Sequence, residues 1–296
     1  MDKKSLLSVH LAVFLFGASG LFVKMIPVSA ILLTLSRALF SAIALYIYIH
    51  FRQYSLRFHR LIDYFWNILA GLLLSTHWFF FILSIQVSTV SIGTITFATY
   101  PLFVIFIEPY VFKEKFQYKN LISVFMIIIG IAFLIPAFQL NNQTTLGIIY
   151  GLISSFSYAI LSVVNRRLST LYDSVVVTLY EQGVAACLLT IVVSIVHPYL
   201  GQGTFVDFIR LVIYGLIFTA LAHSLYIYGL KNVKAQTASI ISVLEPIYSI
   251  FLAMLFLQER LVYQEIIASV IILLAVMIGS IPIKGERDSE KISDTN

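Results

Sequence analysis

The feature that most constrains this chain is a run of apolar residues that recurs along it, each run long enough to cross a lipid bilayer. The stretch from Ala235 to Leu257 has 23 residues and one charged side chain, Glu245. A helix of that length covers the roughly 30 Å of a bilayer's hydrocarbon core. The sequence predicts an all-α integral membrane protein with ten transmembrane helices, at about Leu6–Val23, Val28–Ile49, Phe65–Ile85, Ser88–Val111, Leu121–Phe138, Leu146–Val164, Val175–His197, Ile209–Tyr228, Ala235–Leu257 and Ile266–Ile283.

Composition supports this class and argues against several others. Hydrophobic residues make up 60% of the 296 positions and charged residues 11%, which is too apolar for a soluble domain of this size. The net charge of +5 would suggest a nucleic-acid partner in a soluble protein, but here the basic residues lie between the spans. The single Cys187 excludes an internal disulfide and a cysteine metal cluster, and the sequence has no phosphate-binding loop or HExxH motif. We therefore expect no nucleic acid, no metal or cofactor, and no ATP-driven step.

The first span follows a basic start and contains the small residues Gly17–Gly20, a pattern that imitates a signal peptide. Apolar residues continue past the small cluster, so we expect a transmembrane helix instead. The tail Lys284–Asn296 is polar and has no apolar period, which predicts disorder.

The breaks in the apolar pattern recur at a constant offset of 145 residues, which indicates two related halves. In each half a mid-span proline is followed by an acid-base turn and a further apolar span. The matched positions are Pro101 and Pro246, Glu114-Lys115 and Glu259-Arg260, and Tyr118 and Tyr263. We expect a first five-helix repeat at 5–139 and a second at 145–283, with the polar segment Gln139–Thr145 between them.

The distribution of Lys and Arg predicts the orientation in the membrane, because short loops rich in these residues stay in the cytoplasm. With both termini inside the cell, fifteen of the 19 basic residues fall on the cytoplasmic side. Lys24, Arg210 and Arg260 fall outside, and Arg37 lies within a span. Five helices per half is an odd number, so the second half enters the membrane from the opposite side. Such inverted repeats are typical of secondary transporters, whose substrate site lies near the midplane between the halves.

These motifs resemble those of the drug/metabolite transporter superfamily and its EamA-like branch. The second half carries Leu244-Glu245-Pro246 and Gln258-Glu259-Arg260, and the first half carries Tyr100-Pro101 and Lys113-Glu114-Lys115. The resemblance covers nearly the whole chain and is specific for the fold, but it says little about the substrate. It implies a central cavity lined by helices one, three, four, six, eight and nine, with helices five and ten at the periphery. It also implies amino acids, related amines or nucleobases as candidate cargo.

Polar residues inside spans are the candidate site, because a charge at mid-membrane costs at least ~2.5–3.5 kcal/mol and usually faces a bundle interior. Glu245 is expected to hold a substrate amine or a proton, with a bond to a neighbouring helix as the structural alternative. Arg37 could bind a substrate carboxylate by a forked contact, or pair with Glu181. The depths of Arg37 and Glu181 in the membrane differ by about seven residues, or ~10 Å, so the direct pair is less favoured.

Aromatic and histidine side chains near mid-span form the second group of candidate site residues. His77 and His223 lie in spans three and eight and could titrate near neutral pH. Trp78, Tyr100 and Tyr158 lie on three helices and could line a pocket for a flat or amphipathic solute. Ordinary helix packing is a strong alternative for all five in a chain with 24 Phe and 17 Tyr.

We therefore expect a secondary transporter, and not an enzyme, in the cytoplasmic membrane with both termini in the cytoplasm. It would move a small polar metabolite, for example an amino acid, by alternating access or facilitated diffusion, and the family resemblance implies export. Its expected partners are this small-molecule substrate, the lipid bilayer, a coupling proton and, as one option, a second copy in a homodimer. The alternatives are a nucleotide-sugar transporter, a cationic-drug transporter and a membrane-embedded enzyme using Glu245 and the histidines. The scarcity of intramembrane Lys and Arg argues against a nucleotide sugar, and the duplication argues against an enzyme.

Overall fold

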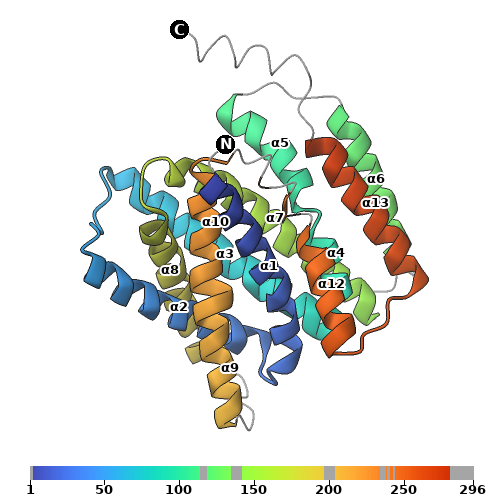
Figure 1. Cartoon of the computed structure of the whole chain (residues 1–296), viewed down its shortest axis with the longest axis horizontal. Helices are drawn as coiled ribbons and strands as arrows, with labels where there is room; N and C mark the ends of the chain where they lie inside the picture. Colours follow the sequence, from blue (N-terminus) through green and yellow to red (C-terminus); the bar gives the residue numbers. More distant parts are fainter. Residues whose placement is uncertain are drawn as a thin grey trace.

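The computed structural model describes residues 3–113, 119–134, 142–196, 204–233, 238, 241–242 and 244–280. All regular secondary structure in these residues is helical (Figure 1). The helices are α1 (Lys3–Met25), α2 (Ala30–Arg52), α3 (Leu61–Val87), α4 (Val90–Phe97), α5 (Tyr100–Phe112), α6 (Lys119–Leu134), α7 (Gln143–Ser169), α8 (Ser174–Val196), α9 (Phe205–Gly215), the π-helical turn η1 (Leu216–Leu221), α10 (Ala222–Leu230), α12 (Leu244–Phe256) and α13 (Tyr263–Ser280).

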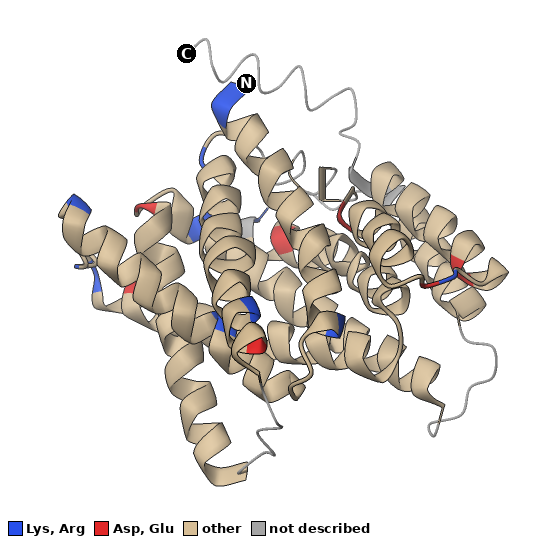
Figure 2. Cartoon of the chain, turned by 60° about the horizontal axis from the view of Figure 1, so that its bottom comes forward, with Lys and Arg blue, Asp and Glu red and all other residues tan. Residues whose placement is uncertain are grey.

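Several of these helices are suited to a membrane by length and composition. Seven stretches within the described residues are long and apolar enough to cross a bilayer, and shorter apolar helices accompany them. Large apolar side chains such as Phe51, Phe125 and Ile195 are exposed on the outer faces of the helices. Charged residues are few over these surfaces (Figure 2). The chain is an all-helical, multi-pass membrane protein.

Two of the expected spans are not regular α-helices. The fourth span divides into α4 and α5, because Pro101 in the first turn of α5 has no N–H to donate to the preceding turn. Thr99 instead donates its N–H to Thr96 O at 3.2 Å, a tighter turn than an α-helix has. The eighth span runs through α9, η1 and α10, and its π-helical turn was not predicted.

Small residues let the central helices approach closely. A Cβ atom at Gly71 of α3 would lie 2.8 Å from the Glu181 carbonyl oxygen of α8, and one at Gly151 of α7 would lie 2.8 Å from Thr96 Cβ of α4. Gly17 of α1 packs in the same way against Glu245 O and Tyr248 Cβ of α12. The small-residue cluster at 17–20, which imitates a signal peptide in the sequence, is thus the contact between α1 and α12. Contacts of this kind replace the hydrophobic drive that is missing between helices in lipid.

Helices α6 and α13 lie side by side at one edge of the molecule (Figure 1). Leu134 clusters with Ala268 and Ile272, whereas Ile127 clusters with Ala275 and Val276. Residue numbers rise along one helix as they fall along the other, so the two helices are antiparallel.

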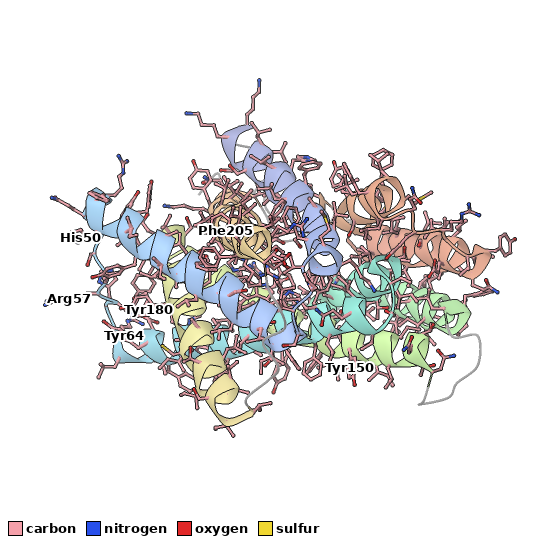
Figure 3. The ribbon with its side chains drawn as sticks, turned by 90° about the horizontal axis from the view of Figure 1, so that it is seen from below. His50, Arg57, Tyr64, Tyr150, Tyr180 and Phe205 are labelled. Atoms are coloured by element: carbon pink, nitrogen blue, oxygen red, sulfur yellow. The ribbon has the colours of Figure 1, made fainter. Side chains whose placement is uncertain are left out.

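An aromatic cluster closes the end of the bundle that holds the connection from α2 to α3. Phe58 packs against Tyr64, Tyr172 and Tyr180 with ring centroids 4.5–4.9 Å apart. Figure 3 shows Tyr64 and Tyr180 beside one another, with Arg57 and His50 at the same end. The Tyr172 hydroxyl also donates to Asp63 Oδ2 at 2.6 Å, which ties the α7–α8 connection to α3.

Some sequence-based expectations fall outside the described residues. These are the turn Glu114-Lys115 with Tyr118, the first three residues of the polar segment Gln139–Thr145, and the tail Lys284–Asn296.

Candidate functional site

A narrow cavity lies among the central helices, with space of about 30 Å³ for water. Since a single water needs roughly 10–15 Å³ of such space, the cavity holds only about two or three water molecules. Its lining comes from α1, α2, α3, α4, α7, α10 and α12, through Phe16, Ser19, Arg37, His77, Trp78, Phe81, Phe97, Tyr158, His223 and Glu245. All six helices expected to line a cavity contribute, and α2 contributes as well through Arg37.

Arg37 is held by contacts from three elements, α3, α9 and η1. Its Nε donates to Thr219 Oγ1 at 3.1 Å and its Nη1 donates to the Tyr214 hydroxyl at 3.0 Å. The guanidinium carbon lies 4.0 Å from the Trp78 ring centroid and 4.6 Å from that of Tyr214. These contacts fix the orientation of the guanidinium and compensate part of the cost of burying its charge.

The π-helical turn explains how two residues of one span reach Arg37 together. In a regular α-helix, residues five positions apart are rotated by about 140° and face different directions. In this structure Thr219 donates its hydroxyl to Tyr214 O, five residues earlier, at 2.9 Å. The wider turn therefore brings Tyr214 and Thr219 to the same side, where both accept from Arg37. Single π turns of this kind are frequent at functional sites.

Glu245 lines the same cavity from α12 and is 7% exposed. Arg37 and Glu245 lie close enough to interact electrostatically. The cavity thus presents one fixed positive charge and one carboxyl group between aromatic rings.

The aromatic candidates lie together, but not all of them reach the cavity. His77 Nδ1 shares a hydrogen bond of 2.7 Å with Ser154 Oγ, and its ring lies 4.7 Å from that of Tyr158 and 4.9 Å from that of Phe97. Tyr100 stacks on Phe97 at 5.2 Å and contacts Tyr158 at 4.9 Å, one layer behind the lining. Tyr100 therefore supports the aromatic wall instead of forming its surface.

The alternative pairing of Arg37 with Glu181 is wrong. Glu181 Oε2 lies 2.8 Å from His223 Nε2, and Arg37 bonds Tyr214 and Thr219 instead. The physical reason is the depth difference seen in the sequence, together with the π-helical turn that supplies Arg37 with nearer acceptors.

Sequence reasoning missed several residues that contact the site. Phe16, Ser19, Phe81 and Phe97 line the cavity, and Tyr214 and Thr219 position Arg37. The small cluster at 17–20 was a signal for α1, because small residues mark close helix contacts. The others are ordinary aromatic or hydroxyl residues in a chain rich in both, and they carry no such signal.

A helical bundle whose apolar helices surround a cavity lined by buried charged groups is typical of small-molecule membrane transporters. The model of the EamA-like transporter family matches residues 3–135 and again residues 145–281, and the chain belongs to this family. The protein is therefore a membrane transporter, and the family model matches each half of the chain once.

Individual relatives agree with this assignment. An "uncharacterized transporter" of Archaeoglobus fulgidus is 26% identical over 67% of this chain and 70% of its own length. An uncharacterized transporter of Clostridium kluyveri is 24% identical over 70% of this chain and 68% of its own length. One of Bacillus subtilis is 21% identical over 86% of this chain and 83% of its own length. A solved structure described as "Crystal structure of protein" covers 94% of this chain and 96% of its own, with a TM-score of 0.68 and 15% identity, which shows a shared fold.

Proposed function

We propose that the protein is a secondary transporter of small zwitterionic metabolites, with amino acids as its substrates. The observation that supports this most is the placement of Arg37 and Glu245 on the lining of one cavity. Besides the N–H groups that bond Thr219 and Tyr214, the guanidinium has further N–H donors that suit a carboxylate, and the Glu245 carboxylate suits an ammonium group. The rings of Phe16, Trp78 and Tyr158 provide apolar surface for a side chain between the two charges.

Alternating access is the proposed mechanism, because the cavity is small. With space for only about two or three waters, it must widen before it accepts a metabolite. Binding would draw the guanidinium and the carboxyl group onto one ligand and so favour an arrangement of the helices that differs from the empty one. Transport would follow if the widened cavity opens to one side of the membrane at a time.

The proposal includes ten transmembrane helices in two inverted repeats, at 5–139 and 145–283. The packing of the helices supports this, because contacts recur when each helix is exchanged with its counterpart in the other half. The contact of α3 with α7 corresponds to that of α10 with α1, and the contact of α1 with α12 corresponds to that of α7 with α4 and α5. The pair α6 and α13 consists of counterparts and is antiparallel, as an inverted repeat requires.

We further propose that the protein lies in the cytoplasmic membrane with both termini inside the cell, and that it works as an exporter. The excess of basic residues on one side supports the orientation. A nucleotide sugar is disfavoured as substrate, since Arg37 is the one Lys or Arg among the lining residues of this cavity and a diphosphate carries more charge than it compensates. A purely cationic substrate is kept as an outcome of the binding test below.

Binding of three matched compounds to the purified protein tests this function. L-phenylalanine carries both charges, phenylethylamine only the ammonium and phenylpropionate only the carboxylate. Isothermal titration calorimetry should give an affinity for phenylalanine at least about tenfold above that for either analogue, because each analogue leaves one buried charge without its partner. If phenylethylamine binds as tightly as phenylalanine or more tightly, the protein is a transporter of cations instead. If the protein binds none of the three compounds and does not bind L-leucine, the proposed function is rejected.

A further inference from the structure

A second pair of titratable groups lies directly behind the cavity wall. His223 of α10 lines the cavity, and its Nε2 lies 2.8 Å from Glu181 Oε2 of α8. The Glu181 side chain is 0% exposed and that of His223 is 3% exposed. Glu181 therefore meets the cavity only through the imidazole ring.

The carboxyl group of Glu181 is incompletely satisfied. Its second oxygen, Oε1, is buried and has no hydrogen-bond partner within the part of the chain that the structure describes. A buried carboxylate with an unpaired oxygen is costly, and a bound proton removes its charge. The partner, His223, carries a charge only when it is itself protonated. The net charge of the pair is therefore decided by the number of protons that it holds.

The charged and titratable groups around the pair lie on α2, α3, α7, α10 and α12, whereas α1, which also packs against α10, faces His223 with the ring of Phe16 at 6.4 Å. These groups are Arg37 from α2, His77 from α3, Tyr158 from α7, Tyr226 from α10 and Glu245 from α12. Arg37 is the fixed cation of this group, and its donors are directed to Tyr214 and Thr219 instead of Glu181. When the pair holds one titratable proton, its net charge is zero. The proton then lies either on the imidazole, which gives an ion pair, or on the carboxyl group, which gives a neutral acid beside a neutral imidazole.

We infer that the Glu181–His223 pair is a proton-binding site that couples proton movement to transport, separate from the substrate carboxyl group of Glu245. This inference rests on the proposed function of the cavity. A proton from cavity water binds the imidazole, and the proton on Nε2 passes to Glu181. When the cavity opens to the other side of the membrane, Glu181 returns its proton to Nε2 of His223, and the imidazole releases its other proton to water. The pair takes up one proton and releases one proton in each cycle, and no other reactant is needed.

The coupling follows from the position of His223 in both the pair and the cavity wall. A substrate that enters the cavity displaces the water from which His223 receives its proton, so substrate occupancy and proton exchange affect each other. If the pair were only structural, it would hold α8 and α10 together, and transport would not respond to a pH gradient.

The test uses the purified full-length chain in liposomes, with L-phenylalanine as the transported probe. Uptake is measured at equal pH and under a gradient of one pH unit applied in either direction. For one proton per substrate, this gradient supports about a tenfold change in accumulation. We expect the wild type to respond by about this factor to one gradient direction, and Glu181→Gln and His223→Gln to lose the response. Glutamine keeps a hydrogen-bonding group at each position, so folding is preserved.

A matched control is Glu265→Gln, a buried carboxyl group on α13 that accepts from Val262 N at 3.1 Å in its own first turn. This variant should respond to the gradient like the wild type. A second measurement is infrared titration of the purified protein, in which the signal of a protonated carboxylic acid should be smaller in Glu181→Gln than in Glu265→Gln.

Two results would overturn the inference. One is a gradient response of wild-type size in Glu181→Gln, and the other is an infrared titration in which Glu181→Gln removes no acid signal. If wild-type vesicles transport no amino acid, the proposed function fails separately, and the infrared titration still decides whether Glu181 takes up a proton.

Discussion

At the scale of single residues, charge inside an apolar span was the signal that pointed to the candidate site. Glu245 and Arg37 were identifiable from the sequence because burying either group is costly, and both line one cavity. Hydroxyl and aromatic groups cost much less to bury, so Thr219 and Tyr214 could not be distinguished from packing residues. Tyr100 illustrates the opposite error, since its mid-span position suggested a lining role that Phe97 and Tyr158 fill instead.

The first prediction concerns the carboxyl group of Glu245. Glu245→Gln keeps the size and hydrogen-bonding capacity of the side chain but removes its negative charge. We expect the affinity for L-phenylalanine to fall by about tenfold or more, since hydrogen bonds to charged groups contribute about 1.5–3 kcal/mol. Calorimetry on the purified variant measures this.

Glu259→Gln provides a second comparison for this prediction. Glu259 accepts from Val90 N at 3.3 Å at the end of the bundle, away from the cavity lining, and an amide oxygen can still accept there. This variant should bind phenylalanine with wild-type affinity. Native affinity in Glu245→Gln would make that carboxyl group a packing element.

At the scale of elements, periodicity and length predicted where helices lie but not how two of them depart from α-helical geometry. The division of the fourth span at Ala98–Thr99 had a visible cause in Pro101. The π-helical turn had none, because it is stabilised by the contact of Arg37 with Tyr214 and Thr219, residues 177 and 182 positions away in the chain. Long-range contacts of this kind cannot be read from local sequence.

The second prediction tests the π-helical turn through Thr219. Thr219→Val preserves the shape of the side chain and removes the acceptor for Arg37 Nε. Loss of a hydrogen bond to a charged group should reduce the free energy of unfolding by about 1.5–3 kcal/mol. Thermal unfolding in detergent measures the effect. Thr178→Val is the control, because Thr178 is equally buried and donates to Ser174 O within its own helix. Equal effects of the two substitutions would show that Thr219 has no special role in holding Arg37.

The third prediction concerns close packing between α7 and Ser88, the residue that follows α3. A Cβ atom at Gly147 would lie 2.6 Å from Ser88 Cβ, so Gly147→Ala forces the two segments apart. Overpacking of this kind destabilises by about 1–3 kcal/mol. Gly183→Ala is the control, since a Cβ atom there has no neighbour within 4 Å among the described residues outside its own helix. A variant at Gly147 as stable as the one at Gly183 would contradict the packing.

At the scale of the whole molecule, the sequence predicted the class of protein and the approximate positions of the helices within the described residues, because apolar length is a direct requirement of the bilayer. The spacing of Pro101 and Pro246 also indicated the duplication, which agrees with the family match to each half of the chain. The size and lining of the cavity were beyond prediction, because they depend on how helices from both halves rotate against one another.

The fourth prediction concerns orientation. Because basic residues concentrate on one side, a reporter fused after Asn296 and another inserted at Lys113 should both report the cytoplasm. A reporter placed in the connection at Gln258 should report the exterior. An external signal from either of the first two sites would contradict the ten-helix topology.

The central claim is that Arg37 and Glu245 together carry a zwitterionic substrate through this cavity, and exchange of labelled L-phenylalanine across liposomes tests it most directly. Vesicles with the wild-type protein and internal unlabelled phenylalanine should take up the label in a saturable way. Arg37→Gln and Glu245→Gln should each lower uptake at subsaturating substrate by about tenfold or more, while Glu265→Gln retains it. Uptake no greater than in protein-free liposomes, or wild-type uptake in both cavity variants, would contradict the account.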